Sequence, residues 1–200
     1  MKIAIDLNDV LRDFTRQFAK YYKIGYDHSF EINEDDIWTN DIRALFPFKS
    51  DKAFEQFAYE NFAYDIYGAC PTTTKKLSAL FNNWMSNIVP DIDSEEPIEF
   101  MIVSPMEFNL SIPSTYFFIS KFGARIREIL LPVDSSEIWD KCDVLITANP
   151  QLLDTKPEGK VSVKIEAEYN KESNADLKYI NMETFVLDEK NIEKIIKKMK

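Results

Sequence analysis

The sequence predicts an α/β protein built on a parallel sheet, from three observations. Short β-prone runs alternate with amphipathic stretches, as strands and helices do in such folds. The runs end in polar residues, which is typical of strands whose carboxyl ends meet at one functional edge. The chain has 200 residues, 45% of them hydrophobic, enough to form a buried core in one domain with or without an insertion.

The first strand is expected over Lys2 to Leu7, because this run is mainly apolar and β-prone. A helix is expected over Val10 to Tyr22. Leu11, Phe14 and Phe18 fall on one face of that helix and would face the core.

The segment from Tyr26 to Tyr67 has a different character, because it contains no convincing strand. Helical spacing covers Glu34 to Phe46 and Asp51 to Phe62, and Ser50 is placed to cap the second of these helices. We interpret the segment as a helical insertion.

The alternation of strands and helices returns after Gly68. Residues Thr72 to Thr74 can cap a helix over Leu77 to Ile88, which carries a clean apolar stripe. A strand over Ile98 to Val103 ends before a proline, which cannot donate to a central ladder, and a helix follows near Ser114 to Phe122.

The last part of the chain repeats the same pattern. Further strands are expected at Ile126 to Leu131, Val144 to Ile146 and Val161 to Ile165. The polar stretch from Glu166 to Asp176 is expected to form a loop. An amphipathic helix from Asp188 closes the fold.

The charge balance argues against two classes of partner. Thirty-four acidic residues against 24 basic ones give a formal net charge of −10. Such a chain repels phosphate backbones and anionic lipid surfaces. We therefore expect neither bulk nucleic acid nor a membrane as its partner.

Cysteine and glycine usage excludes several kinds of site. Cys70 and Cys142 lie far apart, so the sequence indicates neither a disulfide scaffold nor a cysteine-based zinc site. The four glycines are isolated, which excludes the phosphate-binding loops GxxxxGK[ST] and GxGxxG. The single histidine, His28, is expected to be an exposed loop residue.

Targeting signals are not apparent in this sequence. The first residues turn acidic at Asp6, too early for a signal peptide, and no apolar run approaches the ~18 residues that span a bilayer. With two unpaired cysteines, this predicts a cytoplasmic protein.

The run from Ile3 to Phe14 carries a resemblance to a known family. Asp6 to Leu11 resembles the first motif of the haloacid dehalogenase-like (HAD) phosphatases, an apolar strand followed by Asp-x-Asp-Gly-[Val/Thr]-Leu. More narrowly, Asp13 and Phe14 make the run similar to the 5'(3')-deoxyribonucleotidase group. The segment Asp143 to Pro150 resembles the nucleotidase strand that ends Leu-Ile-Asp-Asp-x-Pro.

This resemblance implies a three-layer, Rossmann-like core with a parallel sheet, formed by residues 1–14 and 68–200. It also implies a helical cap, residues 15–67, inserted after the first strand. Aromatic side chains of the cap could stack on a base, whereas their helical spacing favours the core of a small helical bundle. These aromatic residues are Trp38, Phe46, Phe48, Phe54, Phe57, Tyr59, Phe62, Tyr64 and Tyr67.

The resemblance assigns roles to the residues of the first motif. Asp6 stands at the position of the nucleophile, which becomes an aspartyl-phosphate, and would also bind metal together with the backbone of Asn8. Asn8 stands where the family has its acid/base aspartate, and an amide cannot move a proton in this way. Asp9 occupies the glycine position and is the candidate substitute acid.

The resemblance also assigns residues to phosphate and Mg²⁺ binding. Ser104 fits the phosphate-binding Ser/Thr, and Lys141 is the nearest candidate for the phosphate-binding lysine, although a solvated lysine at a strand entry explains it as well. Thr147 and Ala148 replace both acidic metal residues of the later motif. Asp154 is the remaining candidate for a displaced metal ligand.

Three interpretations of the function remain open at this stage. The substitutions favour a binding or regulatory protein on a HAD scaffold, with phosphatase chemistry impaired or absent. The partner expected for such a protein is a small phosphorylated molecule or a nucleotide. The alternative is an active Mg²⁺-dependent phosphatase for nucleotides or other small phosphomonoesters, with Asp6 as nucleophile and Asp9 or Asp154 replacing missing groups. The third is an unrelated α/β domain in which Asp6 merely ends a strand.

Overall fold

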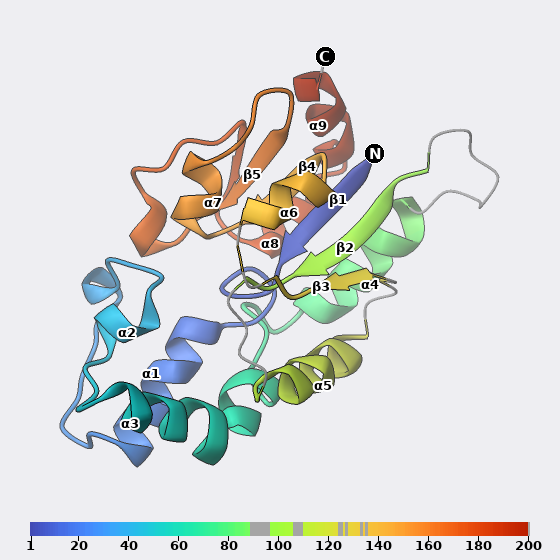
Figure 1. Cartoon of the computed structure of the whole chain (residues 1–200). Helices are drawn as coiled ribbons and strands as arrows, with labels where there is room; N and C mark the ends of the chain where they lie inside the picture. Colours follow the sequence, from blue (N-terminus) through green and yellow to red (C-terminus); the bar gives the residue numbers. More distant parts are fainter. Residues whose placement is uncertain are drawn as a thin grey trace.

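The computed structural model describes residues 1–88, 97–105, 110–123, 126, 128–132, 134 and 136–199. Within these residues, six parallel strands form one sheet in the order β3-β2-β1-β4-β5-β6 (Figure 1). The predicted α/β fold is thereby confirmed. The strands are β1 (Lys2–Asp6), β2 (Glu99–Val103), β3 (Glu128–Leu130), β4 (Val144–Thr147), β5 (Val161–Ile165) and β6 (Leu177–Tyr179).

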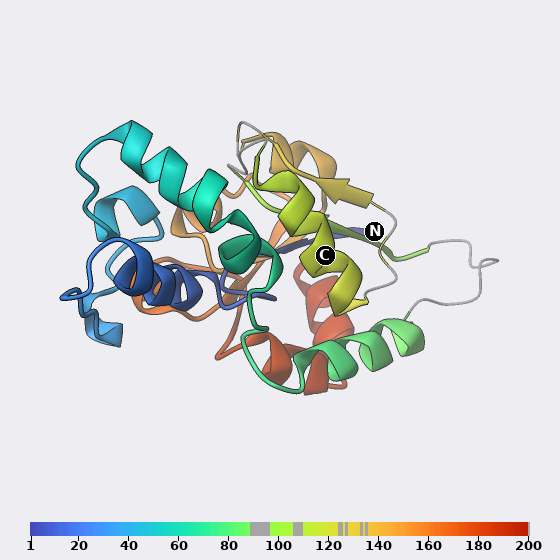
Figure 2. The same cartoon turned by 90° about the horizontal axis from the view of Figure 1, so that it is seen from below.

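Helices cover both faces of the sheet and give three layers (Figure 2). Ile3 and Ile5 of β1 face a core shared with α4, α5, α8 and α9, whereas Ala4 faces α6 and α7. This alternation follows from the period of two along a strand. The helices are α4 (Leu77–Ile88), α5 (Ile112–Phe122), α6 (Ser136–Lys141), α7 (Pro150–Asp154), α8 (Met182–Leu187) and α9 (Asn191–Met199).

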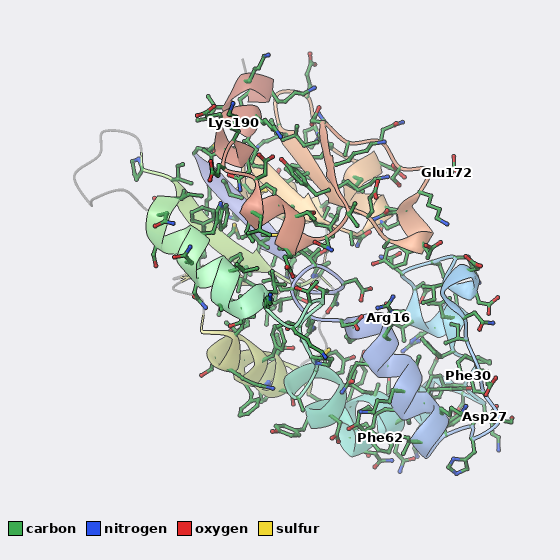
Figure 3. The ribbon with its side chains drawn as sticks, turned by 180° about the vertical axis from the view of Figure 1, so that it is seen from behind. Arg16, Asp27, Phe30, Phe62, Glu172 and Lys190 are labelled. Atoms are coloured by element: carbon green, nitrogen blue, oxygen red, sulfur yellow. The ribbon has the colours of Figure 1, made fainter. Side chains whose placement is uncertain are left out.

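Residues 14–68, which we call the helical region, lie beside the α/β part and have their own aromatic core (Figure 1). Asp27 and Phe30 mark the end of this region that lies far from the sheet (Figure 3). The region consists of α1 (Phe14–Gly25), the 3₁₀ turn η1 (Glu34–Asp36), α2 (Ile42–Leu45), α3 (Asp51–Glu55) and the π-helical segments η2 (Gln56–Asn61) and η3 (Tyr64–Gly68).

The aromatic side chains of the helical region mostly form its core. Seven of the nine predicted for this role are buried or pack against the cluster, and Phe18 contacts four of the phenylalanine rings. Trp38 and Tyr64 instead expose 67% and 54% of their surface. The core interpretation is therefore confirmed for the seven packed residues.

Two predicted helices have different bounds in the structure. The helix expected over Val10 to Tyr22 begins only at Phe14, because the chain before it turns tightly, with the Arg12 amide bonded to the Leu7 carbonyl. The expected helix over Glu34 to Phe46 is broken into η1 and α2. The side chain of Asp41 caps α2 and fixes its start.

Several short elements were not predicted from the sequence. These are β6, α6, α7 and α8, each with three to six residues. The expected loop over Glu166 to Asp176 contains a single 3₁₀ turn, η4 (Glu168–Asn170). Elements this short carry too few apolar residues to show a clear period.

The topology places β1 at the switch point of the sheet. Asp6 pairs with Val103 of β2 on one side, and Ile5 pairs with Ile146 of β4 on the other. From β1 the chain continues to β2 and β3 on one side, and it then returns to β4, β5 and β6 on the other side. Ligands of open α/β sheets bind where the direction of crossing reverses in this way. A ligand-binding or catalytic site is therefore expected at the carboxyl ends of β1 and β4.

No helix in the described part of the chain is both long and apolar enough to cross a bilayer.

Candidate functional site at the carboxyl edge of the sheet

Asp6 ends β1 and lies under the surface, with 2% of its area exposed. Its Oδ2 accepts a hydrogen bond of 2.7 Å from the Thr147 hydroxyl at the end of β4. That hydroxyl oxygen accepts in turn from the Asn149 amide at 3.0 Å. The other Asp6 oxygen, Oδ1, is buried and has no donor at bonding geometry among the described residues.

Burial dominates the electrostatics of Asp6 and raises its pKa to about 7. The Thr147 hydrogen bond and the nearby amides of Asn8 and Leu7 lower the pKa, and the negative charge of Asp9 raises it. At neutral pH the carboxyl group is therefore divided between its neutral and ionised forms. A neutral carboxyl group is a poor nucleophile.

Asn8, which the motif resemblance aligns with an acid/base aspartate, is held by a charged neighbour. Its Oδ1 accepts a hydrogen bond of 2.7 Å from Nε of Arg12. Arg12 is fully buried and also donates to the Tyr67 carbonyl and the Thr115 hydroxyl, at 3.2 and 3.0 Å. The amide of Asn8 thus takes part in a network that joins the turn after β1, the helical region and α5.

Asp9 adopts the left-handed backbone conformation that favours glycine, with φ of 58°. Its carboxylate accepts from the Thr15 amide at 2.9 Å, from the Thr15 hydroxyl at 2.6 Å and from the Tyr169 hydroxyl at 2.9 Å. Burial and the charge of Asp9 hold the pKa of Tyr169 well above its usual value. Asp9 therefore positions the start of α1 and the turn after β5.

Ser104 and Ala148 occupy the expected strand ends but expose no surface. Ser104 follows β2 directly and is fully buried, with its amide bonded to the Leu130 carbonyl at 3.1 Å. Ala148 is equally buried, and its carbonyl accepts a 2.8 Å bond from the Asn170 amide group. Both residues are thus at the predicted edge of the sheet and closed to solvent.

The structure does not bring Lys141 or Asp154 to Asp6. Lys141 is exposed at the end of α6 and precedes β4, so it lies at the amino end of the sheet, where Asp143 bonds to Lys2. Asp154 is exposed at the end of α7, and its charge acts on Lys164 of β5. His28 is exposed, as predicted, with its ring nitrogen near the Lys23 carbonyl.

Lys164 and Arg12 were missed by the sequence interpretation. Lys164 has 2% of its surface exposed, and its Nζ donates to the carbonyls of Asn170 and Ser173, both at 2.9 Å. Burial lowers the pKa of this lysine. The available signals were a lysine inside a strand and an arginine that directly follows the apolar pair Val10 and Leu11.

We expect Lys164→Met to loosen the turn that carries Tyr169. The variant removes the donor that ties this turn to β5, at a cost of about 1–2 kcal/mol, because release of a buried charge offsets part of the loss. Amide hydrogen exchange should accelerate over residues 167–173. Lys178→Met, on the exposed face of β6, is the matched control, and equal exchange in both variants would refute this role of Lys164.

A cavity of about 280 Å³ opens beside this edge, on the side of β5 and β6. Asp9, Tyr169 and Asn181 belong to its wall, and Arg16 of α1 lines it from the helical region. Figure 3 shows Arg16 at the junction between the helical region and the α/β part. The residues that line the cavity do not include Asp6.

Comparisons with known proteins identify the fold. No family model and no curated protein sequence matches this chain. Fourteen solved chains match in structure, among them a crystal structure from Burkholderia xenovorans described as a "putative haloacid dehalogenase-like hydrolase". Its TM-score is 0.55 at 11% identity, over 94% of this chain and 95% of that chain. The chain therefore has the fold of a HAD-like hydrolase.

The residues at the switch point do not fit the Mg²⁺ site that this fold implies. Mg²⁺ requires hard oxygen ligands, chiefly carboxylates and water. Thr147 uses its hydroxyl proton for Asp6, and Ala148 has no ligating side chain. In the described ranges, no three carboxylate, histidine or cysteine side chains are grouped so that they could hold a metal ion.

Proposed function

We propose that the protein is a binding or regulatory protein on a HAD-like scaffold and does not hydrolyse phosphomonoesters. One observation carries this proposal: the Asp6 carboxyl group is buried beneath Thr147, while the position of its proton-transfer partner holds the amide of Asn8. A small molecule is the partner that we propose for it.

The chemistry of ester cleavage explains why this observation supports the proposal. Attack on phosphorus needs an ionised Asp6 oxygen within reach of the substrate, and burial both hides the oxygen and favours its neutral form. The leaving alkoxide needs a proton, which the amide of Asn8 cannot supply. These two deficits act on the same step.

The alternative, an active phosphatase, requires a substitute for the missing groups. Asp9 already accepts three hydrogen bonds, which hold its carboxylate in place for a structural purpose. Asp154 lies exposed at the end of α7, where its charge acts on Lys164. No described contact favours this alternative.

An assay of phosphate release tests the proposal. With Mg²⁺ and a panel of deoxynucleoside monophosphates and sugar phosphates, we expect the wild type and Asp6→Asn to release phosphate at the rate of a protein-free blank. Turnover that disappears in Asp6→Asn would overturn the proposal, because a contaminating phosphatase would be unaffected by this substitution. Circular dichroism of both proteins controls for folding.

A further inference from the structure

A short turn after β5 crosses the carboxyl edge of the sheet. Residues 166–170, which we call the edge turn, follow β5 directly and contain η4. The side-chain amide of Asn170 donates to the Ala148 carbonyl at 2.8 Å. Ala148 directly follows Thr147, whose hydroxyl donates to Asp6. The edge turn is therefore bonded to the chain one residue beyond the group that holds Asp6.

Tyr169 of the edge turn reaches the end of β1. Its hydroxyl donates to the carboxylate of Asp9 at 2.9 Å. Burial raises the pKa of Tyr169, and the negative charges of Asp9 and Asp6 raise it further, so the hydroxyl lies near both carboxyl groups. Since β4 lies between β5 and β1, the edge turn extends across the switch point of the sheet.

The cavity of about 280 Å³ adjoins the same tyrosine. Tyr169 and Asp9 belong to its lining, whereas Asp6 does not. Asp6 exposes only 2% of its surface, and its Oδ1 has no hydrogen-bond partner among the described residues. The side chain of Tyr169 therefore stands between the cavity and a buried carboxyl group.

The two side chains that tie the edge turn to its neighbours are held to different degrees. Asn170 exposes 1% of its surface, and its side chain takes part in three hydrogen bonds, while its carbonyl accepts from Lys164. Tyr169 is partly exposed, and its hydroxyl makes one hydrogen bond within the described residues. Moving the Tyr169 side chain costs that one bond, whereas moving the whole turn costs several. The tyrosine can therefore swing into the cavity while the turn stays in place.

We propose that Tyr169 is a gate between the cavity and Asp6. The hydrogen bond to Asp9 holds the gate closed, and rotation of the ring into the cavity opens a path to Asp6 and Thr147. A small molecule that binds only the open form would shift the protein toward it. This inference rests on the proposed function, because it describes how a ligand of a binding protein reaches the edge of the sheet.

Chemical labelling of carboxyl groups tests the gate. A water-soluble carbodiimide with glycinamide converts accessible carboxyl groups into amides, and peptide mass spectrometry gives the rate at each site. Because a buried group reacts only when the structure opens locally, the rate at Asp6 follows the open fraction of the gate. In the wild type, Asp6 should react far more slowly than the exposed Asp154.

Two variants should open the gate to different extents. Tyr169→Phe keeps the ring but loses a hydrogen bond to a charged acceptor, which should raise the labelling rate of Asp6 about tenfold. Tyr169→Ala also removes the ring and should raise the rate further. Tyr179→Ala is the matched control, because Tyr179 likewise bonds an aspartate, Asp188 at 2.7 Å, but lies on the outermost strand β6. It should leave the labelling of Asp6 unchanged, and circular dichroism checks the fold of each variant.

The outcomes separate the gate from the proposed function. The gate is overturned if wild-type Asp6 reacts as fast as Asp154, if neither folded Tyr169 variant reacts faster, or if Tyr179→Ala has an equal effect. An opened Asp6 in Tyr169→Ala should still release no phosphate from the substrate panel, because Asn8 cannot supply the proton. Phosphate release that disappears when Asp6 is replaced, in the wild type or in Tyr169→Ala, would overturn the proposed function and leave the gate standing.

Discussion

The free energy of unfolding of the wild type is expected to fall steeply between pH 5 and pH 8, and Asp6→Asn is expected to abolish most of this fall. Burial raises the pKa of Asp6 from 3.8 to about 7 in the folded chain. Below pH 3.8 both folded and unfolded chains hold this proton, and its contribution to stability is fully present. As the pH rises from 3.8 to 7, the unfolded chain releases the proton and the folded chain retains it, so unfolding becomes easier.

The size of this effect follows from the shift. Each pH unit within the window costs about 1.4 kcal/mol, so the wild type should lose about 3 kcal/mol more than Asp6→Asn between pH 5 and pH 8. Urea unfolding of both proteins at several pH values measures the difference. Parallel pH profiles would show that Asp6 keeps an ordinary pKa.

The comparison with Asp6→Asn is needed because other carboxylates titrate with the opposite sign. Hydrogen bonds from Ser29 lower the pKa of Asp27, and those from Ser136 lower the pKa of Asp134. Their contributions are present above their unfolded pKa and are lost as the pH falls. Subtracting the two profiles cancels these groups and leaves the contribution of Asp6.

Arg12→Met is expected to destabilise the protein by about 3–5 kcal/mol, because it breaks a buried charged network. The guanidinium group donates to Asn8, Tyr67 and Thr115, and the substitution leaves these acceptors without their donor. It also removes contacts with the faces of aromatic rings, including Tyr67 at 5.3 Å. Urea unfolding at pH 7 measures the loss.

Arg16→Met is the matched control for this prediction. Arg16 lies one turn further along the chain with 59% of its side chain exposed, and we expect a change below about 0.5 kcal/mol. Equal destabilisation by the two substitutions would contradict the role given to Arg12. A small effect of Arg12→Met alone would do the same.

The strands and long helices were predictable because their apolar residues recur with a clear period. β1, β2, β4 and β5 are short apolar runs, and α4 carries a continuous apolar stripe. The start of α1 was not predictable in this way. It depends on the left-handed turn at Asp9, which apolar spacing does not reveal.

The sequence predicted where in the sheet the candidate site lies, but it did not predict that Asp6 is buried there. Motif resemblance placed Asp6, Ser104 and Thr147 at the carboxyl ends of β1, β2 and β4, and the sheet brings Asp6 and Thr147 within one hydrogen bond. Burial is a property of the whole fold, so the sequence could not show that Asp6 is closed to solvent. The contacts of Arg12 with Tyr67 and Thr115 join distant segments and were hidden for the same reason.

The central place of β1 in the sheet has a consequence for the order of folding. β1 pairs with strands that begin only at Glu99 and Val144, so closing its ladder requires large loops in the chain. The aromatic core of residues 14–68 needs contacts within one contiguous segment. During synthesis, residues 14–68 should therefore fold first. The edges of β1 should remain unpaired until β2 and β4 have been made.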